Sequence, residues 1–310
     1  MATFRAASED EDEKLSLILC NAFLPLWNHN WFQNISTPLN PIPLTNEYKP
    51  QIPLTPLQTS RLKFYHALIK LTRAHGGSIS ITSVPQTSLP NTTPSPTQVD
   101  DIGAIILWLP PKKRITLPFS IPKLLTSGFL SALANYGLTS IYRLQAIFES
   151  NVDQMFATHV QAKSGFLPAD CGFVQMLAIN PKFAGRGYAS ALLGWKCARH
   201  FEEFGGVPVI LDTTTEAGVR AYLRLGFEVL EERMVHTGTD AGGILLKGDA
   251  GGGVKEEAAR VMESIVRIFG NFTSLDCQKT TALDITWKVI NGRSKLFSKE
   301  RESTNPRHDA

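Results

Sequence analysis

The segment from Met176 to Leu193, MLAINPKFAGRGYASALL, constrains the fold more than any other part of the chain. An apolar run typical of a buried strand ends at a proline, and two glycines then lead into a helical pattern. Gly185 and Gly187 let the main chain approach a ligand closely, because neither carries a Cβ atom. The N–H groups at a helix start lack acceptors within the helix and lie at the positive end of its dipole. The segment therefore predicts a strand–turn–helix unit with an anion site suited to a pyrophosphate.

Two better-known phosphate-binding loops do not fit this segment. A P-loop requires Gly-Lys-Ser or Gly-Lys-Thr after four intervening residues, and that order is absent. The dinucleotide fingerprint requires a third glycine and a ribose-binding acid about 20 residues further on. The residues after Gly187 do not supply that glycine at the right place. The glycines alone are equally compatible with a tight turn that binds nothing.

The rest of the chain alternates between extended and helical patterns, which predicts a single α/β domain over residues 1–292. Ser8 and Glu11 form a capping-box signature before the first helix. The segments 24–57, 85–98 and 238–253 lack a clean period, although the first has room for one short helix, and residues 293–310 are predicted to be a disordered tail. We expect strands over 2–7, 78–84, 102–109, 173–179, 207–212, 227–234 and 281–290, and helices near 15–23, 62–72, 124–136, 141–162, 185–204, 217–225 and 255–269.

Charge and cysteine content argue against several functional classes. The 31 Lys and Arg against 28 Asp and Glu leave a formal charge of +3, without a basic run, so no nucleic-acid partner is expected. No apolar run approaches the roughly 20 residues that span a bilayer, so no membrane partner is expected. The N-terminal residues are acidic, unlike a presequence, and the four cysteines lack metal-ligand spacing. These features predict a cytoplasmic protein without a bound metal.

Two segments together resemble a known family. The order LAINP followed by GRGYA, over 177–189, is similar to the acetyl-CoA-binding motif of the GNAT superfamily of acyl-CoA N-acyltransferases. Residues 215–227, TEAGVRAYLRLGF, resemble that family's Asn-x-x-Ala-x-x-Leu-Tyr-x-x-x-Gly-Phe segment. Lys182 stands where the family usually has Arg or Gln, and Thr215, Gly218 and Ala221 replace Asn, Ala and Leu. The resemblance covers about residues 171–234, a fifth of the chain.

The resemblance implies a fold and a cofactor site. The implied fold has a mixed, mostly antiparallel sheet of six to seven strands, flanked by helices and splayed open at the acetyl-CoA site. Main-chain amides from Ala184 to Ser190 would hold the pyrophosphate, and residues 177–179 would pair with the pantetheine arm like an added strand. The implied cofactor-binding residues are Leu177, Ala178, Ile179, Ala184, Gly185, Arg186, Gly187, Tyr188, Ala189, Ser190 and Thr215.

The resemblance also implies the chemistry, which is direct attack of an amine on the thioester of acetyl-CoA. Tyr222 would give a proton to the leaving thiolate, and a backbone N–H near Ala178 or Ile179 would polarise the carbonyl. Without the motif, the sequence would predict that Tyr222 is an aromatic core residue. The general base stays open, because the strand before the loop carries Gln175 and no acid. Three acids elsewhere, or a water chain, are alternatives: Asp170, Asp212 and Glu216.

The predicted activity is that of an N-acetyltransferase acting on an amine of a small molecule or peptide, as a monomer or homodimer. Three alternatives remain open from the sequence: an O-acyltransferase, a user of longer acyl chains, and a protein that binds acetyl-CoA without catalysis. The acceptor cannot be derived from the sequence. Trp27, Trp31 and Phe32 favour a small organic amine mildly, and they are equally compatible with packing.

Overall fold

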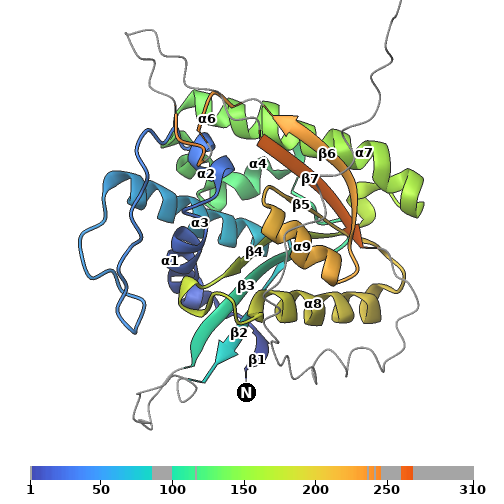
Figure 1. The fold of residues 1–310 in the computed structure, drawn as a ribbon, viewed down its shortest axis with the longest axis horizontal. Helices are drawn as coiled ribbons and strands as arrows, with labels where there is room; N and C mark the ends of the chain where they lie inside the picture. Colours follow the sequence, from blue (N-terminus) through green and yellow to red (C-terminus); the bar gives the residue numbers. More distant parts are fainter. Residues whose placement is uncertain are drawn as a thin grey trace, which may run out of the picture.

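A sheet of seven strands in the order β1-β2-β3-β4-β5-β7-β6 runs through the computed structural model of the chain (Figure 1). The structure describes residues 2–85, 100–115, 117–235, 237–240, 242–245 and 260–267. Neighbouring strands are antiparallel except β4 and β5, which are parallel. The predicted mixed, mostly antiparallel α/β fold is therefore confirmed. The strands are β1 (Thr3–Ala6), β2 (Ser78–Val84), β3 (Asp101–Leu109), β4 (Gly172–Ile179), β5 (Val209–Thr213), β6 (Glu228–Val235) and β7 (Arg260–Arg267).

Strand β3 explains why the sheet is covered on both faces. All nine of its residues are buried, as its nearly continuous apolar sequence predicts. Because side chains alternate along a strand, Ile105 and Leu107 enter one hydrophobic core, whereas Ile106 and Trp108 enter another. The first core includes residues of α1 to α5 and α7, and the second includes residues of α8 and α9. The helices are α1 (Asp12–Ala22), α2 (Trp27–Phe32), α3 (Pro56–Ala74), α4 (Leu117–Thr126), α5 (Phe129–Ala134), α6 (Leu138–Tyr142), α7 (Ser150–Ser164), α8 (Tyr188–Phe204) and α9 (Glu216–Arg224).

Several local predictions are confirmed. The main-chain N–H of Ser8 donates to Glu11 Oε2 at 3.0 Å in the predicted capping box. The irregular segment 24–57 contains one short helix, α2. The predicted helix over 124–136 is divided between α4 and α5, because Gly128 adopts a left-handed conformation with φ +75°. A π-helical turn, Arg143–Glu149, connects α6 to α7.

The prediction of a helix over 255–269 was wrong. Residues 260–267 form β7, which pairs with β5 on one side and β6 on the other. The apolar residues of this segment do recur at helical spacing, but several are β-branched and suit a strand equally well. Hydrogen bonding to two neighbouring strands decides between the two structures. The predicted strand over 281–290 and the predicted tail over 293–310 lie outside the described residues, as do 86–99 and 246–259.

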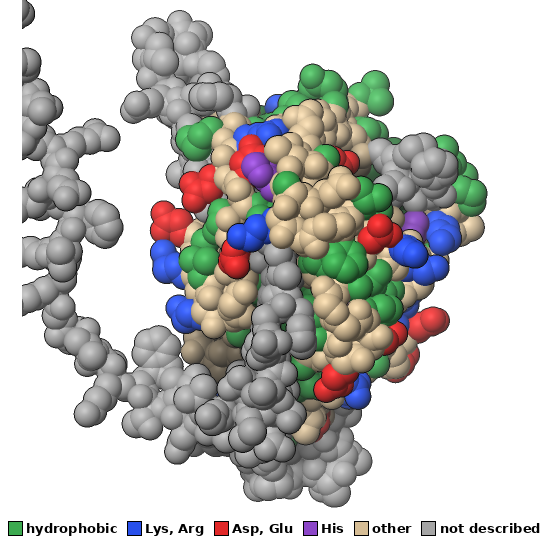
Figure 2. Space-filling model, turned by 90° about the vertical axis from the view of Figure 1, so that its right-hand side faces the viewer, with side chains coloured by type: hydrophobic (Ala, Val, Ile, Leu, Met, Phe, Trp, Pro, Cys, Tyr) green, Lys and Arg blue, Asp and Glu red, His purple; other side chains and the backbone are tan. Residues whose placement is uncertain are grey.

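The surface agrees with the balanced composition. On the face drawn in Figure 2, acidic and basic side chains of the described residues are interspersed with apolar ones. Within the described ranges, no helix has both the length and the hydropathy that crossing a bilayer requires.

Candidate functional site

The parallel join between β4 and β5 is short, and this opens the sheet. The strands pair only at Gly172 with Val209 and at Phe173 with Ile210. Strand β4 nevertheless stays paired with β3 out to Ile179. Beyond the join, the edge of β4 that faces β5 has no strand partner among the described residues. The predicted splaying of the sheet is therefore confirmed.

A cavity of ≈ 360 Å³, here called the β4–β5 cleft, occupies this opening. Its walls come from β4, the end of β5, the start of α8, the length of α9, and the segment 22–29. The cleft thus brings together segments that the two sequence motifs contain. Seven of the predicted site residues line it, namely Leu177, Ala178, Ile179, Ala189, Ser190, Thr215 and Tyr222. The other five, Ala184, Gly185, Arg186, Gly187 and Tyr188, form the turn and helix start between β4 and the lining part of α8.

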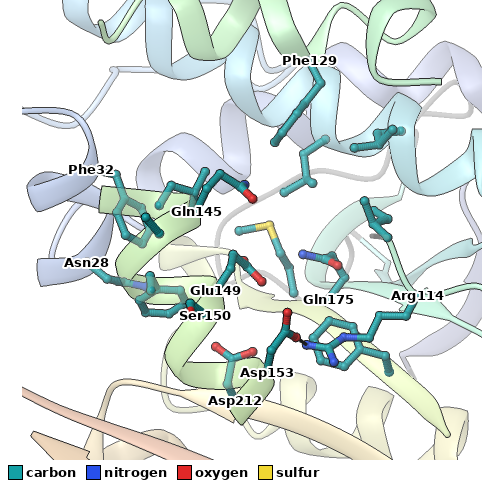
Figure 3. Close-up of a pocket in the computed structure, with 18 of the residues that line it drawn as sticks. Asn28, Phe32, Arg114, Phe129, Gln145, Glu149, Ser150, Asp153, Gln175 and Asp212 are labelled. Atoms are coloured by element: carbon teal, nitrogen blue, oxygen red, sulfur yellow. Dashed lines mark ion pairs between the residues drawn. The ribbon is translucent and has the colours of Figure 1, made fainter. Parts of the chain in front are cut away.

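An irregularity in β4 lies beside the cleft. Leu107 of β3 pairs with Met176, but the next residue, Trp108, pairs with Val174. Gln175 is therefore skipped in the ladder, and such a bulge re-aims side chains locally. In Figure 3, the side chain of Gln175 points into a second, larger cavity that adjoins the cleft.

The turn after β4 has the conformation that its glycines predict. Gly185 and Gly187 have φ angles of +80° and +75°. A Cβ atom placed on either glycine would meet no atom of the described residues within 4 Å, so both face open space. Helix α8 begins at Tyr188, three residues later than predicted, and its N-cap, Gly187, has no side chain to accept a hydrogen bond. Helix geometry leaves the first N–H groups of α8 without helical acceptors, as an anion site requires.

A group of polar side chains, here called the loop clamp, holds this turn against β3. Asn180 donates through Nδ2 to the Ile102 carbonyl at 2.7 Å and to Tyr48 Oη at 3.0 Å. The buried Asp101 carboxylate accepts from Tyr48 and pairs with Lys182 Nζ at 2.5 Å. Lys182, which differs from the Arg or Gln that the sequence resemblance would place there, is therefore engaged with a carboxylate. The clamp consists of Tyr48, Asp101, Asn180 and Lys182.

Tyr222 and Thr215 have different surroundings within the cleft. Tyr222 is 9% exposed and packs against Phe227. Burial raises the pKa of Tyr222, and the nearby Asp212 raises it further. The phenol is therefore protonated at neutral pH. Thr215 caps α9 and accepts the N–H of Gly218 at 3.1 Å.

A larger cavity of ≈ 730 Å³, here called the helical cavity, adjoins the cleft. Five residues line both: Asn28, His29, Gln175, Met176 and Asp212. Most of the wall of the helical cavity is apolar. One end carries charged groups, and Figure 3 shows Glu149, Asp153 and Asp212 pointing into that end beside Arg114. The apolar lining includes Phe32, Phe64, Leu68, Phe129, Leu144 and Phe148.

The carboxylates of the helical cavity are not equivalent. Arg114 Nη2 pairs with Asp153 Oδ1 at 2.8 Å. Burial raises the pKa of Glu149 to about 7, with the nearby charge of Asp212 contributing and Arg114 opposing. Burial also raises the pKa of Asp212 to about 6, and again Arg114 opposes the shift. Among the described residues, no ion pair neutralises Glu149 or Asp212, so both favour the approach of a cation.

The structure separates the three acids left open as the general base. Asp170 ends a short 3₁₀ turn and lines neither cavity. Glu216 is exposed and pairs with Arg220 at 3.0 Å. Asp212 lies where the two cavities meet. Sequence reasoning missed Glu149, although an acid directly after the buried Phe148, within an apolar helical pattern, was a usable signal.

No metal group is visible in the part of the chain that the structure describes: no three His, Cys, Asp or Glu side chains are grouped as ligands. Cys171 and Cys197 are buried, and burial raises the pKa of the Cys171 thiol to about 12. A thiol in that state is a poor nucleophile.

Comparison with known proteins gives distant structural likenesses. No family model and no curated protein matches the chain. A Corynebacterium glutamicum protein, described as histone acetyltransferase HPA2 and related acetyltransferase, is 15% identical over 88% of this chain and 98% of its own, with a TM-score of 0.46. Arylalkylamine N-acetyltransferase 2 from Aedes aegypti is 14% identical over 87% and 99%, with a TM-score of 0.47. Ribosomal-protein-alanine N-acetyltransferase from Brucella melitensis is 11% identical over 86% and 99%, with a TM-score of 0.40. Likenesses this distant assign no activity or residue to the chain.

Proposed function

We propose that the chain is an acetyl-CoA-dependent N-acetyltransferase that transfers an acetyl group to an amine of a small molecule or peptide. The β4–β5 cleft is the observation that carries the proposal. An unpartnered strand edge leads along Leu177–Ile179 to a glycine turn and a helix start with free N–H groups. Tyr222 closes the cleft from α9. The order of strand edge, anion cradle and proton donor is the one that both sequence motifs imply.

The described residues fit acetyl-CoA as a co-substrate. Main-chain N–H groups of Gly185 and of Gly187 to Ser190 would hold the pyrophosphate, because this turn offers donors and open space. The predicted N–H donors of Ala184 and Arg186 are instead used within the turn, where they donate to the carbonyls of Pro181 and Phe183. The free edge of β4 at 177–179 would pair with the amides of the pantetheine arm, as a peptide strand pairs with a sheet edge. The thioester would then lie near the bulge at Gln175, between the two cavities.

Acetyl transfer needs a neutral amine, a polarised carbonyl and a proton for the leaving sulfur. The nitrogen lone pair forms the C–N bond, and the C–S bond then breaks. The nitrogen gives up one proton, to a base or to solvent, as the amide forms. A main-chain N–H on the cleft edge of β4 would stabilise the oxyanion. Tyr222 would protonate the thiolate and regain its proton from solvent. Because the thiolate leaves in the same desolvated cleft, burial raises its pKa together with that of Tyr222.

Gly187→Leu tests the cofactor site most directly, with Gly165→Leu as its matched control. Both glycines have positive φ angles, and a Cβ on either meets nothing within 4 Å. Both are left-handed residues at a helix end, with ψ angles of 4° and −5°, so the backbone strain is similar, but Gly165 follows α7 and lines neither cavity. Calorimetry should detect acetyl-CoA binding to the native chain and to Gly165→Leu, and none to Gly187→Leu. No binding to folded native protein, or equal binding to the two variants, would refute the proposal.

The finer expectations stay predictions. These are the cytoplasmic location and the monomeric or homodimeric state.

A further inference from the structure

The helical cavity combines features that select for one kind of acceptor. Its volume of ≈ 730 Å³ lies within the range of small-molecule sites, about 300–1,000 Å³. Aromatic and aliphatic side chains form most of the wall, among them Phe32, Phe129 and Phe148. This lining favours a ring or branched alkyl body over a polar chain, since apolar area is removed from water on binding.

The polar end of the cavity selects for a cation. Three carboxylates, those of Glu149, Asp153 and Asp212, face one guanidinium, that of Arg114. Because Arg114 is paired with Asp153, the other two carboxylates repel each other unless a proton or an external cation intervenes. An ammonium group between them would satisfy both.

Two neighbours make the junction of the two cavities suitable for an amine. Asn28 Oδ1 is buried and has no hydrogen-bond partner among the described residues, and Asn28 lines both cavities. An amide oxygen in that state accepts an N–H readily. His29 lines the same junction, but burial and the charge of Arg61 lower its pKa to about 3, and its Nδ1 lies 3.0 Å from Tyr65 Oη. His29 is therefore neutral and does not repel a cation.

We propose that the helical cavity binds a primary amine that is protonated in solution and attached to an apolar, ring-sized body, and that Glu149 and Asp212 bind its ammonium group and accept its protons. The proposal rests on the proposed function, because the amine must meet the acetyl thioester at the junction near Gln175. It identifies Glu149, from the π-helical turn, and Asp212, from β5, as the catalytic bases.

The protons and electrons balance as follows. The ammonium loses one proton to the Glu149 carboxylate and becomes a neutral amine. Its lone pair forms the C–N bond, the C–S bond breaks, and Tyr222 protonates the sulfur. The nitrogen loses its second proton to Asp212 as the amide forms. Solvent then reprotonates the Tyr222 phenolate and takes one proton from each carboxylate, so the net release is one proton.

A matched set of acceptors tests the selectivity. 2-Phenylethylamine carries the proposed body and charge, phenylalanine adds a carboxylate to the same body, and ethanolamine lacks the ring. With acetyl-CoA, the native chain should show a kcat/KM for 2-phenylethylamine about 100-fold above that for phenylalanine, because like charges would meet at Glu149 and Asp212. The advantage over ethanolamine should be about 10-fold or more from ring burial.

Glu149→Gln and Asp212→Asn test the residues, and Glu216→Gln is the control because it removes the same charge from an exposed side chain. In the native chain, kcat/KM for 2-phenylethylamine should fall as the pH drops below about 7, where Glu149 becomes protonated. Glu149→Gln should lower kcat/KM about 100-fold and shift that decline to a lower pH, at which Asp212 becomes protonated. With 2,2,2-trifluoroethylamine, a weakly basic amine that is largely neutral at pH 7, Glu149→Gln should lower kcat/KM much less. A merely structural role would affect both amines equally and would keep the pH profile.

The outcomes separate this inference from the proposed function. Acetyl-CoA binding by calorimetry should be unchanged in both variants, which shows that they fold and retain the cleft. If the native chain acetylates phenylalanine or a lysine peptide as well as 2-phenylethylamine, or if Glu149→Gln keeps the native pH profile, the inference is wrong while the proposed function stands. If folded native protein binds no acetyl-CoA, both are wrong.

Discussion

The β4–β5 cleft and the helical cavity meet at Gln175 and Met176, yet they are built in different ways. One side of the cleft is a continuous stretch of chain, residues 174–190, whose strand edge and helix start offer main-chain groups. The helical cavity is assembled from side chains of segments as distant as α2, α4, α7 and β5. A site made of main chain is encoded locally by proline and glycine. A site made of side chains depends on how distant segments pack.

Tyr222→Phe should give the largest effect, because Tyr222 is the side chain on which the cleft depends for chemistry. Loss of a general acid should lower kcat about 100-fold or more. The dissociation constant for acetyl-CoA should stay within about threefold, because the proposed binding groups are main-chain amides. Steady-state kinetics and calorimetry measure the two quantities. An unchanged kcat would remove Tyr222 from the mechanism.

Asp101→Asn should break the loop clamp and so test whether the main-chain site needs side-chain support. Asp101 is 2% exposed and holds both Tyr48 and Lys182. Losing hydrogen bonds to a buried charge should lower the free energy of unfolding by about 2 kcal/mol. Urea denaturation measures the change. The control Glu47→Gln removes an exposed pair with Lys49 and should leave the free energy of unfolding nearly unchanged, because solvent screens such a pair.

Gly103→Ala should disturb the cleft from a distance. A Cβ on Gly103 would lie 2.7 Å from Tyr188 Cδ2 and 2.9 Å from Val84 Cγ2. Relieving this overlap should displace the first residue of α8, whose N–H belongs to the proposed anion site. Acetyl-CoA binding should therefore weaken roughly fivefold, which is about 1 kcal/mol of binding free energy. Gly206→Ala, whose Cβ meets nothing within 4 Å, is the control for calorimetry. Equal affinities for the two variants would show that the helix start tolerates movement.

The smallest expected effect concerns stability: Glu149→Gln should raise the melting temperature in a pH-dependent way. Folding raises the pKa of Glu149 to about 7, above its ordinary value of about 4.3. This group therefore contributes most to stability below its unfolded pKa, and the contribution is lost as the pH rises through about 7. The neutral glutamine avoids that loss. Melting of the variant should exceed that of the native chain at pH 8 by a few degrees, and the difference should disappear toward pH 4.

The same contrast explains what the sequence could predict. The apolar run of β3, the capping box at Ser8 and the turn with Gly185 and Gly187 are local patterns, and the structure contains each of them. The glycines themselves permit the positive φ angles of the turn. Both the strand–turn–helix geometry and its position were therefore predictable.

The remaining features depend on segments that are far apart in sequence. Strand β7 was mistaken for a helix because its pairing with β5 and β6 cannot be seen in a single segment. Tyr48 and Asn180 meet across 132 positions in the loop clamp. Glu149 faces Asp212 only because a π-helical turn and the end of β5 border the same cavity. Their spatial relation decides their chemistry, and composition does not contain it.

Because only two residue pairs join β4 to β5, the sheet is divided mechanically into two leaves. One leaf consists of β1, β2, β3 and β4, and the other consists of β5, β7 and β6. A molecule seated in the opening would touch both leaves and add cross-connections that the hydrogen-bonded ladder lacks. Its binding would stabilise the whole molecule against heat, and this stabilisation would grow with the logarithm of its concentration above the dissociation constant. Thermal denaturation in the presence of candidate compounds could therefore reveal ligands of this chain before any catalytic assay is available.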